Sequence, residues 1–259
     1  MRVVILTFRQ LPIVLRTFFR QANLVFWSFG FFLLLQLLGC GLLAALDPKT
    51  LRPVLCSAVI ALTLLGGGIY GVSYGMWNFF RGGVLERYHR SPYRASAVAA
   101  FVLSRFLVLF AAIVIQLVVV YVAFGVGRAD MGRIGDHALT WRLSLGPLLV
   151  AVALADACFV LMGLCVVTLS RAHFQSYLIS NLLFAVLSLV VMLEPLRLVK
   201  GAWLALPSAQ VMMALEALLG EGAGWSGAWP HLWPLALWCA ALAVVARQTF
   251  DWMVLDRAR

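Results

Sequence analysis

Residues 98–126 read VAAFVLSRFLVLFAAIVIQLVVVYVAFGV, an apolar run in which Arg105 is the only formally charged side chain. A helix needs roughly 20 apolar residues to cross the hydrocarbon core of a bilayer, and this run exceeds that length. A helix that is apolar on every face is stable only when lipid or protein surrounds it. The stretch therefore predicts a membrane-spanning helix.

The rest of the chain repeats this pattern. Of its 259 residues, 64% are hydrophobic and only 12% are charged, about half the charged fraction of a soluble domain. We predict an all-α polytopic membrane protein in which residues 1–259 form one membrane domain. Its six spans are expected at residues 25–46, 51–77, 98–126, 143–169, 174–193 and 232–250.

Charges on the connecting segments orient these spans. With the N-terminus inside, the inner segments hold thirteen Lys and Arg against three acids, and the outer segments hold seven against six. An excess of cations marks the cytoplasmic side of membrane proteins, so both termini are expected in the cytoplasm. A net charge of +10 could indicate a nucleic-acid partner in a soluble protein. Here the asymmetry between the two sides of the membrane accounts for that charge, so we expect no nucleic-acid partner.

The first 24 residues are predicted to form neither a span nor a tail. Arg2, Arg9, Arg16 and Arg20 recur on one side of a helix, and apolar residues fill most of the rest. This pattern is typical of a helix that lies in the membrane interface among lipid headgroups. The alternative is that these arginines are only the cytoplasmic flank of the first span.

Residues 195–231 interrupt the apolar pattern. The breaks within 196–219 are Arg197, Lys200, Pro207 and Glu216. Short helices that enter the outer leaflet and return are expected here, because surrounding protein can bury such irregular backbone. After them come tryptophans that we predict at headgroup level, namely Trp225, Trp229 and Trp233.

Missing motifs exclude several functional classes. An ATP-binding P-loop needs a lysine that reaches the phosphates, and neither of the two lysines, Lys49 and Lys200, ends such a loop. The five cysteines include no Cys-x-x-Cys pair, so neither a metal site nor a disulfide framework is expected. The sequence also contains no visible Ser/His/Asp or His-Glu-x-x-His arrangement that would supply a nucleophile and its base. We therefore expect no enzyme activity and no cofactor bound by this chain.

Asp156 is the one acidic residue deep inside a predicted span. A carboxylate at the bilayer centre costs about 2.5–3.5 kcal/mol on insertion scales, so intramembrane acids usually face a cavity or a partner. Asp156 is therefore a candidate for the translocation pathway or a proton relay. The alternative is a protonated packing residue that meets Gln36, Gln116 or Asn181 across the helices. These three amides are further pathway candidates.

Residues 81–92 read RGGVLERYHRSP and separate the second and third spans on the arginine-rich side. Gly82 and Gly83 break the incoming helix, the following residues can form two short turns, and Pro92 ends them. From residue chemistry alone, the segment is either a solvated loop or a helix that docks a cytoplasmic partner.

This segment resembles the cytoplasmic coupling helix between the second and third spans of type-2 ABC export permeases. The matching positions are Gly83, Leu85, Glu86, Arg87 and Pro92. Val84 stands where the family usually has a hydroxyl residue, and the acid that generally precedes the glycine is replaced in this chain. The N-terminal segment likewise resembles the family's elbow helix, and residues 206–219 resemble its re-entrant segment.

The resemblance implies a permease subunit in a bacterial cytoplasmic membrane, divided into an interfacial helix (1–24), five spans (25–194), a re-entrant segment with an outer loop (195–231), and a last span with its tail (232–259). It would pair with a separate ATPase subunit, which binds ATP and Mg²⁺, and with a second copy of itself or a homologous permease. The first, second and fifth spans would line the pathway. The cargo would be an exported amphipathic compound such as a lipid, a glycan or a drug-like natural product.

Two other hypotheses remain open from the residues. One is a proton- or ion-coupled secondary transporter centred on Asp156. The other is a membrane scaffold that recruits a partner through residues 81–92 and transports nothing.

Overall fold

The computed structural model describes residues 2–20, 25–26, 30–43, 51–81, 94–124, 133–134, 137–138, 145–170, 172–219 and 224–250. Five of its helices are long and apolar enough to cross a membrane. They are α4 (Leu51–Arg81), α6 (Arg94–Phe124), α7 (Leu145–Leu169), α8 (His173–Leu193) and α10 (Gly224–Thr249). The prediction of a helical, multi-pass membrane protein is confirmed.

The predicted first span is described only in part. Its main element is α3 (Phe31–Leu43), a helix of 13 residues. At a rise of 1.5 Å per residue, such a helix is about 20 Å long and does not reach across the roughly 30 Å hydrocarbon core. The first of the six predicted spans therefore stays a prediction.

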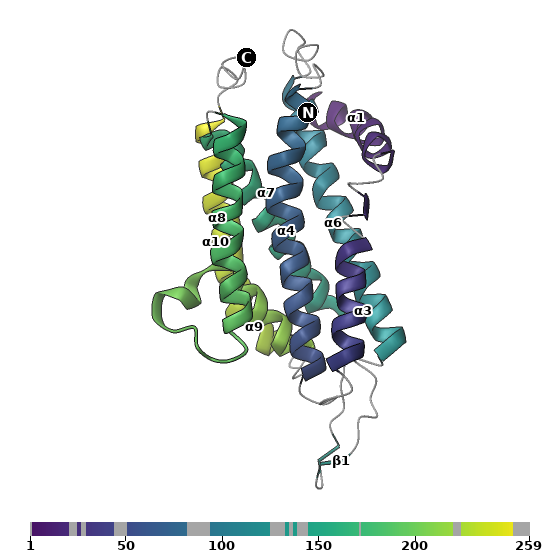
Figure 1. Ribbon diagram of the computed structural model, residues 1–259. Coiled ribbons are helices and arrows are strands. Elements are labelled where there is room, and N and C mark those ends of the chain that lie inside the picture. The colour runs from purple at the N-terminus through teal and green to yellow at the C-terminus, as the bar shows by residue number, and fades with distance from the viewer. Residues whose placement is uncertain are drawn as a thin grey trace.

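The long helices run alternately up and down the bundle (Figure 1). At one end lie α1 (Arg2–Phe19), the last turns of α4 and α10, and the first turn of α6 (Figure 1). We call this the α1 end. The opposite end holds the short helix α9 (Pro207–Leu219), the 3₁₀ turn η2 (Gly201–Ala205), and one small antiparallel pair, β1 (Arg133–Ile134) with β2 (His137–Ala138).

The short helices expected between the fifth and sixth predicted spans are present as η2 and α9. Most of α9 is buried, and it packs against α10, α4 and α7. His231 Nδ1–H donates to Gln210 Oε1 at 3.1 Å, and the Trp238 indole donates to the Ala205 carbonyl at 2.8 Å. These bonds hold the η2–α9 segment against α10.

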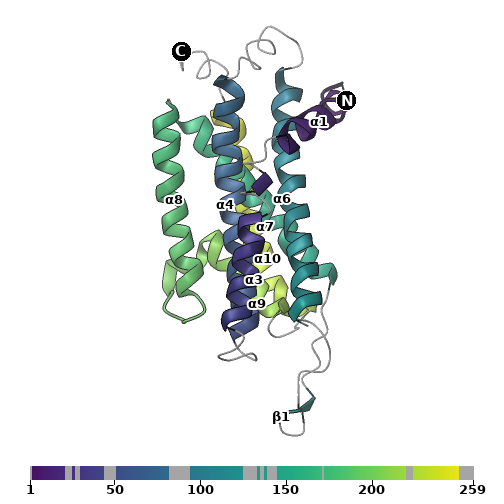
Figure 2. The same ribbon diagram turned by 45° about the vertical axis from the view of Figure 1, so that its right-hand side comes forward.

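Helix α4 is the centre of the bundle and packs against α3, α6, α7, α8 and α9. Figure 2 shows it between α8 and α6. Glycine lets α7 approach it closely: a methyl at Gly68 would lie 2.5 Å from Phe159 Cβ, and one at Gly163 would lie 2.7 Å from the Gly68 carbonyl oxygen. Small residues at such crossings are typical of membrane helices, whose association depends on close packing.

Helix α1 lies across the outside of α6 at the α1 end (Figure 1). Phe18 is buried in this contact, and its ring lies 4.8 Å from the guanidinium carbon of Arg105 on α6. Phe101 covers the same guanidinium at 4.9 Å. Arg105, only 9% exposed, is thus stabilised by two ring faces, as cation–π contacts allow.

The outer surface of α1 is both apolar and basic. Arg9, Arg16 and Arg20 are exposed. Its exposed apolar side chains are Val4, Ile5, Phe8, Ile13 and Phe19. The combination fits the interfacial helix predicted from the sequence, and its position in the membrane remains a prediction.

Candidate functional site between α4 and α8

Two stripes of polar and aromatic side chains face each other where α4 and α8 pack. On α4 the stripe has helical spacing, and its members are Tyr70, Ser73, Tyr74 and Trp77. On α8 the spacing is the same, and the members are His173, Ser176, Tyr177, Ser180 and Asn181. Residues three and four apart share one face of a helix, so each stripe points in one direction. We call these nine residues the α4–α8 seam.

Hydrogen bonds join the two stripes. The Tyr70 hydroxyl donates to Asn181 Oδ1 at 2.8 Å, and the Ser180 hydroxyl donates to Ser73 Oγ at 3.0 Å. Ser73 and Ser180 are both almost fully buried. Because hydrocarbon offers no competing hydrogen-bond partners, such pairs fix the register of the two helices.

Aromatic rings continue the seam towards the α1 end. The ring of Tyr70 lies 5.6 Å from that of Tyr74, which lies 5.5 Å from Tyr177 and 6.3 Å from His173. Trp77 follows at 5.9 Å from the His173 ring. These centroid distances are within or close to the range in which aromatic pairs attract each other. The seam is therefore a continuous row of rings along two spans.

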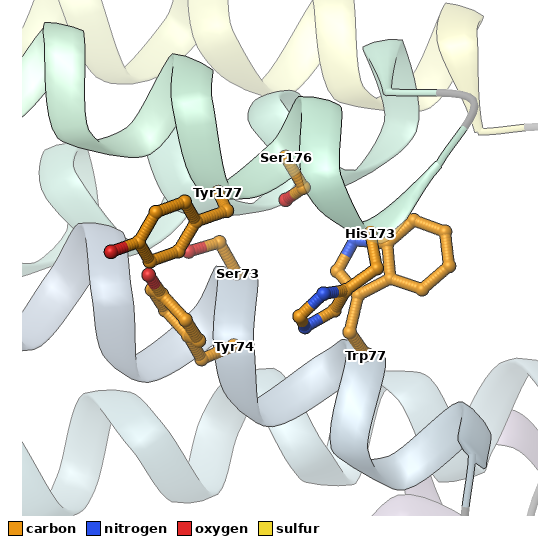
Figure 3. Close-up of a pocket in the computed structure, with 6 residues that line it drawn as sticks. All are labelled: Ser73, Tyr74, Trp77, His173, Ser176 and Tyr177. Atoms are coloured by element: carbon orange, nitrogen blue, oxygen red, sulfur yellow. The ribbon is translucent and has the colours of Figure 1, made fainter.

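The rings enclose a narrow hollow at the α1 end of the seam, in which no space is large enough for a water molecule. Its lining is Ser73, Tyr74, Trp77, His173, Ser176 and Tyr177, all shown in Figure 3. Tyr177 forms the outer wall and is 47% exposed, whereas Ser176 is buried behind it. Ser176 Oγ points into the hollow (Figure 3) and makes no hydrogen bond within the described part of the chain.

The seam is suited to binding rather than to covalent chemistry. It offers ring faces and neutral hydroxyl groups, and none of its nine members is a carboxylate, a cysteine or a lysine. Over the residues that the structure covers, no three His, Cys, Asp or Glu gather into a metal-binding group. As packed here the seam has no room for a solute, so a ligand with aromatic and hydrogen-bonding surface could bind there only if α4 and α8 moved apart.

Asp156 lies outside this seam, in the middle of α7. It is fully buried, and neither carboxyl oxygen makes a hydrogen bond of ordinary geometry with a described residue. The backbone of Phe110 on α6 interacts with the carboxyl group. The carboxyl group therefore faces packed protein, and none of the described hollows includes it.

The three amides named with Asp156 do not pair with it. Gln116 bonds to Thr63 at 3.4 Å, and Asn181 accepts from Tyr70 in the seam. Gln36 on α3 is fully buried and has no hydrogen-bond partner among the described residues. Only Asn181 joins the candidate site.

The remaining predicted positions divide in two. Arg9, Arg16 and Arg20 lie on the exposed side of α1, and Arg2 begins that helix. The predicted coupling positions Gly83, Leu85, Glu86, Arg87 and Pro92 lie outside the described residues.

A second hollow, of about 430 Å³, opens at the other end of the bundle. Glu194, Arg197 and Glu216 line it together with apolar neighbours. The turn after α8 puts Arg197 at φ 54°, and its N–H donates to the Glu194 carbonyl at 2.7 Å. A left-handed arginine costs about 1–2 kcal/mol of backbone strain.

Glu194 makes this end sensitive to pH. Burial raises its pKa above the ordinary value, while hydrogen bonding to Glu216 and the charge of Arg197 partly lower it again. A raised carboxyl pKa means that the folded state binds the proton more tightly than the unfolded state. Its contribution to stability is therefore largest below the ordinary glutamate pKa and is lost as pH rises through the raised value.

We accordingly expect Glu194→Gln to flatten the pH dependence of stability. The melting temperature of the wild type, relative to that of Glu194→Gln, should fall as the pH rises from 4 to 8. Thermal unfolding of both proteins in the same detergent across this range measures it. If the melting temperature of the wild type minus that of Glu194→Gln stays constant or rises with pH, the expectation is wrong.

No protein-family model matches the chain, and searches of curated proteins and of solved structures likewise return no match.

Sequence reasoning identified one of the nine seam residues, Asn181. The signal for the others was their spacing: aromatic and hydroxyl residues recur three and four apart at the ends of two apolar runs, 70–77 and 173–181. Tyrosine and tryptophan are common at membrane interfaces, so this spacing in one run does not distinguish a site from an interfacial belt. The packing of α4 on α8 adds that the two runs face each other.

Proposed function

We propose that this chain is the membrane-spanning permease subunit of an ATP-driven exporter, which moves an amphipathic solute outward with energy from a separate ATPase subunit. The α4–α8 seam carries the proposal. It is a polar and aromatic path between two apolar spans, and these are the second and fifth of the six predicted spans. In the family that residues 83–92 resemble, the first, second and fifth spans line the pathway.

The arrangement of α4 suggests how the ATPase would act on the seam. Arg81 ends α4 and Arg94 begins α6, both at the α1 end (Figure 1). A partner that binds residues 83–92 is therefore connected to α4 by only a few residues. Since α4 carries half of the seam, tilting it relative to α8 would open or close the path. The ATP-bound ATPase subunit would favour whichever of these two states it contacts more strongly.

In this proposal the complete assembly has six spans per permease, with α3 as part of the first span. Two permeases and two ATPase subunits would form the transporter in a bacterial cytoplasmic membrane, with both termini in the cytoplasm. The exposed apolar face of α8, which includes Phe174, Leu178 and Leu182, supports contact of this helix with lipid or with the second permease.

Charge reversal at Glu86 tests the proposal. The tagged full-length chain is purified from its host membrane in mild detergent, and Mg²⁺-dependent ATP hydrolysis in the purified complex is measured together with export from vesicles. We expect Glu86→Arg to lower both by about tenfold or more, because a like charge facing the arginine-rich segment costs several kcal/mol at an interface.

The matched control is Asp251→Arg, an equal charge reversal that the charge count assigns to the same side of the membrane. It should retain both activities. Export without any co-purifying ATPase, or full activity in Glu86→Arg, would contradict the proposal.

The second candidate function is an ion- or proton-coupled secondary transporter. The observation that favours it is Asp156, a buried carboxyl group without an ordinary hydrogen bond. Transporters of that kind use intramembrane acids with nearby ionisable partners, and no such partner contacts Asp156 in the part of the chain that the structure describes.

A further inference from the structure

We infer that Cys158 on α7 and Cys239 on α10 form a modification site, which a lipid hydroperoxide oxidises to a disulfide between these two spans. The inference goes beyond the proposed function and does not depend on it, because both helices carry these thiols outside the α4–α8 seam. It depends on three observations: the contact between the two thiols, their different access to lipid, and the direction of the hydrogen bond between them.

The two thiols meet where α7 and α10 pack against each other. The Cys239 S–H donates to the Leu154 carbonyl oxygen at 3.3 Å. In an α-helix such as α7, this same oxygen accepts from the backbone N–H four residues later, which is that of Cys158. Side chains on a helix lean towards its N-terminus, so the Cys158 sulfur leans towards Cys239. The two side chains accordingly hydrogen-bond to each other.

Cys165 shows that this contact is specific to one pair. It also lies on the side of α7 that packs against α10, where its S–H donates to the Leu242 carbonyl at 3.4 Å. Within the described part of the chain no thiol hydrogen-bonds to it. Seven residues of helix, a rise of about 10 Å, separate it from Cys158, which is too far for a disulfide.

The two thiols of the pair differ in their access to lipid. Cys158 is fully buried, whereas Cys239 is only partly buried. Exposed apolar side chains lie before and after Cys239 on α10, at Leu237 and Val244, as expected for a span that borders lipid. An oxidant dissolved among the acyl chains therefore reaches Cys239 first, and Cys158 reacts only through it.

The direction of the hydrogen bond assigns the same roles. Because the Cys239 S–H is directed to Leu154, the S–H between the two sulfurs is that of Cys158. The thiolate is the nucleophilic form of cysteine, and a donor at this place stabilises negative charge on the Cys239 sulfur as its proton leaves. Cys239 is therefore the attacking thiol, and Cys158 completes the disulfide.

The modification takes two steps and consumes one hydroperoxide, ROOH. The Cys239 sulfur attacks the terminal oxygen and the O–O bond breaks. The lipid leaves as the alcohol ROH with the thiol proton, and Cys239 becomes a sulfenic acid. The Cys158 sulfur then attacks the Cys239 sulfur, which forms the S–S bond and releases water with the Cys158 proton. The thiols lose two electrons in total, and the peroxide gains the same two.

The disulfide would act on the end of the bundle that holds η2 and α9. The residue before Cys239 is Trp238, whose indole donates to the Ala205 carbonyl of η2. Oxidation would thus fix to α7 the same turn of α10 that holds the η2–α9 segment. We expect it to restrict movement of this segment relative to α7.

Counting thiols tests the inference. The purified full-length chain in lipid nanodiscs is treated with linoleic acid hydroperoxide, denatured and alkylated, and mass spectrometry then reports the free thiols and the linked peptides. We expect each chain to lose two alkylatable thiols, to regain them with dithiothreitol, and to yield one peptide pair that joins Cys158 to Cys239. The matched reagent is the hydroxy fatty acid of the same chain, which has no O–O bond and should remove no thiol.

Three variants assign the two roles. Cys239→Ala should leave Cys158 reduced, and Cys158→Ala should stop at a sulfenic acid on Cys239, which dimedone traps. Cys165→Ala removes a neighbouring thiol of α7 and should form the disulfide as the wild type does. An unchanged thiol count in the wild type, a link from Cys239 to another cysteine, or oxidation of Cys158 in Cys239→Ala would overturn the inference. The assay contains no ATPase subunit, so its result is independent of the Glu86 experiment.

Discussion

Gly68→Ala is expected to lower the melting temperature of the purified protein by roughly 2–12 °C, although alanine is the better helix former. The added methyl would lie 2.5 Å from Phe159 Cβ and 2.8 Å from the Phe159 carbonyl carbon. Because the second of these is backbone, the clash can be relieved only by separating α4 from α7. Overpacking of this kind costs about 1–3 kcal/mol, and each kcal/mol shifts melting by about 2–4 °C in a domain of this size.

Gly71→Ala is the matched control, since the same change three residues later on α4 meets nothing within 4 Å. It should leave the melting temperature unchanged or slightly higher, because alanine has about 1 kcal/mol better helix propensity than glycine. Thermal unfolding in detergent, followed by size-exclusion chromatography, measures both variants. Equal melting temperatures for the two would mean that α4 and α7 do not cross as closely as the structure has them.

The spans were predictable because their signal is local. A run of apolar residues that is long enough to cross a bilayer forms a helix whatever its neighbours are, and α4, α6, α7 and α8 begin and end within a few residues of the predicted bounds. The N-terminal boundary of α10 differs: it begins at Gly224, eight residues before the predicted start at 232. Pro230 and Pro234 lie inside that helix, and the adjoining tryptophan-rich segment was interpreted as a loop.

The candidate site was harder to predict because its signal is not local. Tyr70 and Asn181 are more than a hundred positions apart, and only the antiparallel packing of α4 on α8 brings them within 2.8 Å. The sequence identified Asn181 as a polar residue within a span but suggested Asp156 as its partner. Helix pairing depends on the shape of whole faces, such as the glycines of α4, and hydropathy does not encode it.

Asp156→Ala is expected to raise the melting temperature of the purified protein. Asp156 and Val152 are both fully buried on α7, one turn apart. Truncating the carboxyl group removes two oxygens that have no ordinary hydrogen bond, and an unsatisfied buried polar group costs about 1–3 kcal/mol. Val152→Ala removes a well-packed apolar side chain and should destabilise by about 1–3 kcal/mol. The two truncations should therefore shift the melting temperature in opposite directions.

Asp156→Asn separates the two candidate functions. It keeps the shape of the side chain and removes only its titration, so the ATP-driven exporter should retain most of its transport, whereas an ion-coupled transporter should lose it. Export from vesicles carrying Asp156→Asn or Glu86→Arg measures this directly. If Asp156→Asn abolishes transport and Glu86→Arg does not, the energy comes from an ion gradient through α7. A loss of stability in Asp156→Ala larger than that in Val152→Ala would mean that the buried carboxyl group has a stabilising partner, because the cavity left by truncation could not account for the difference.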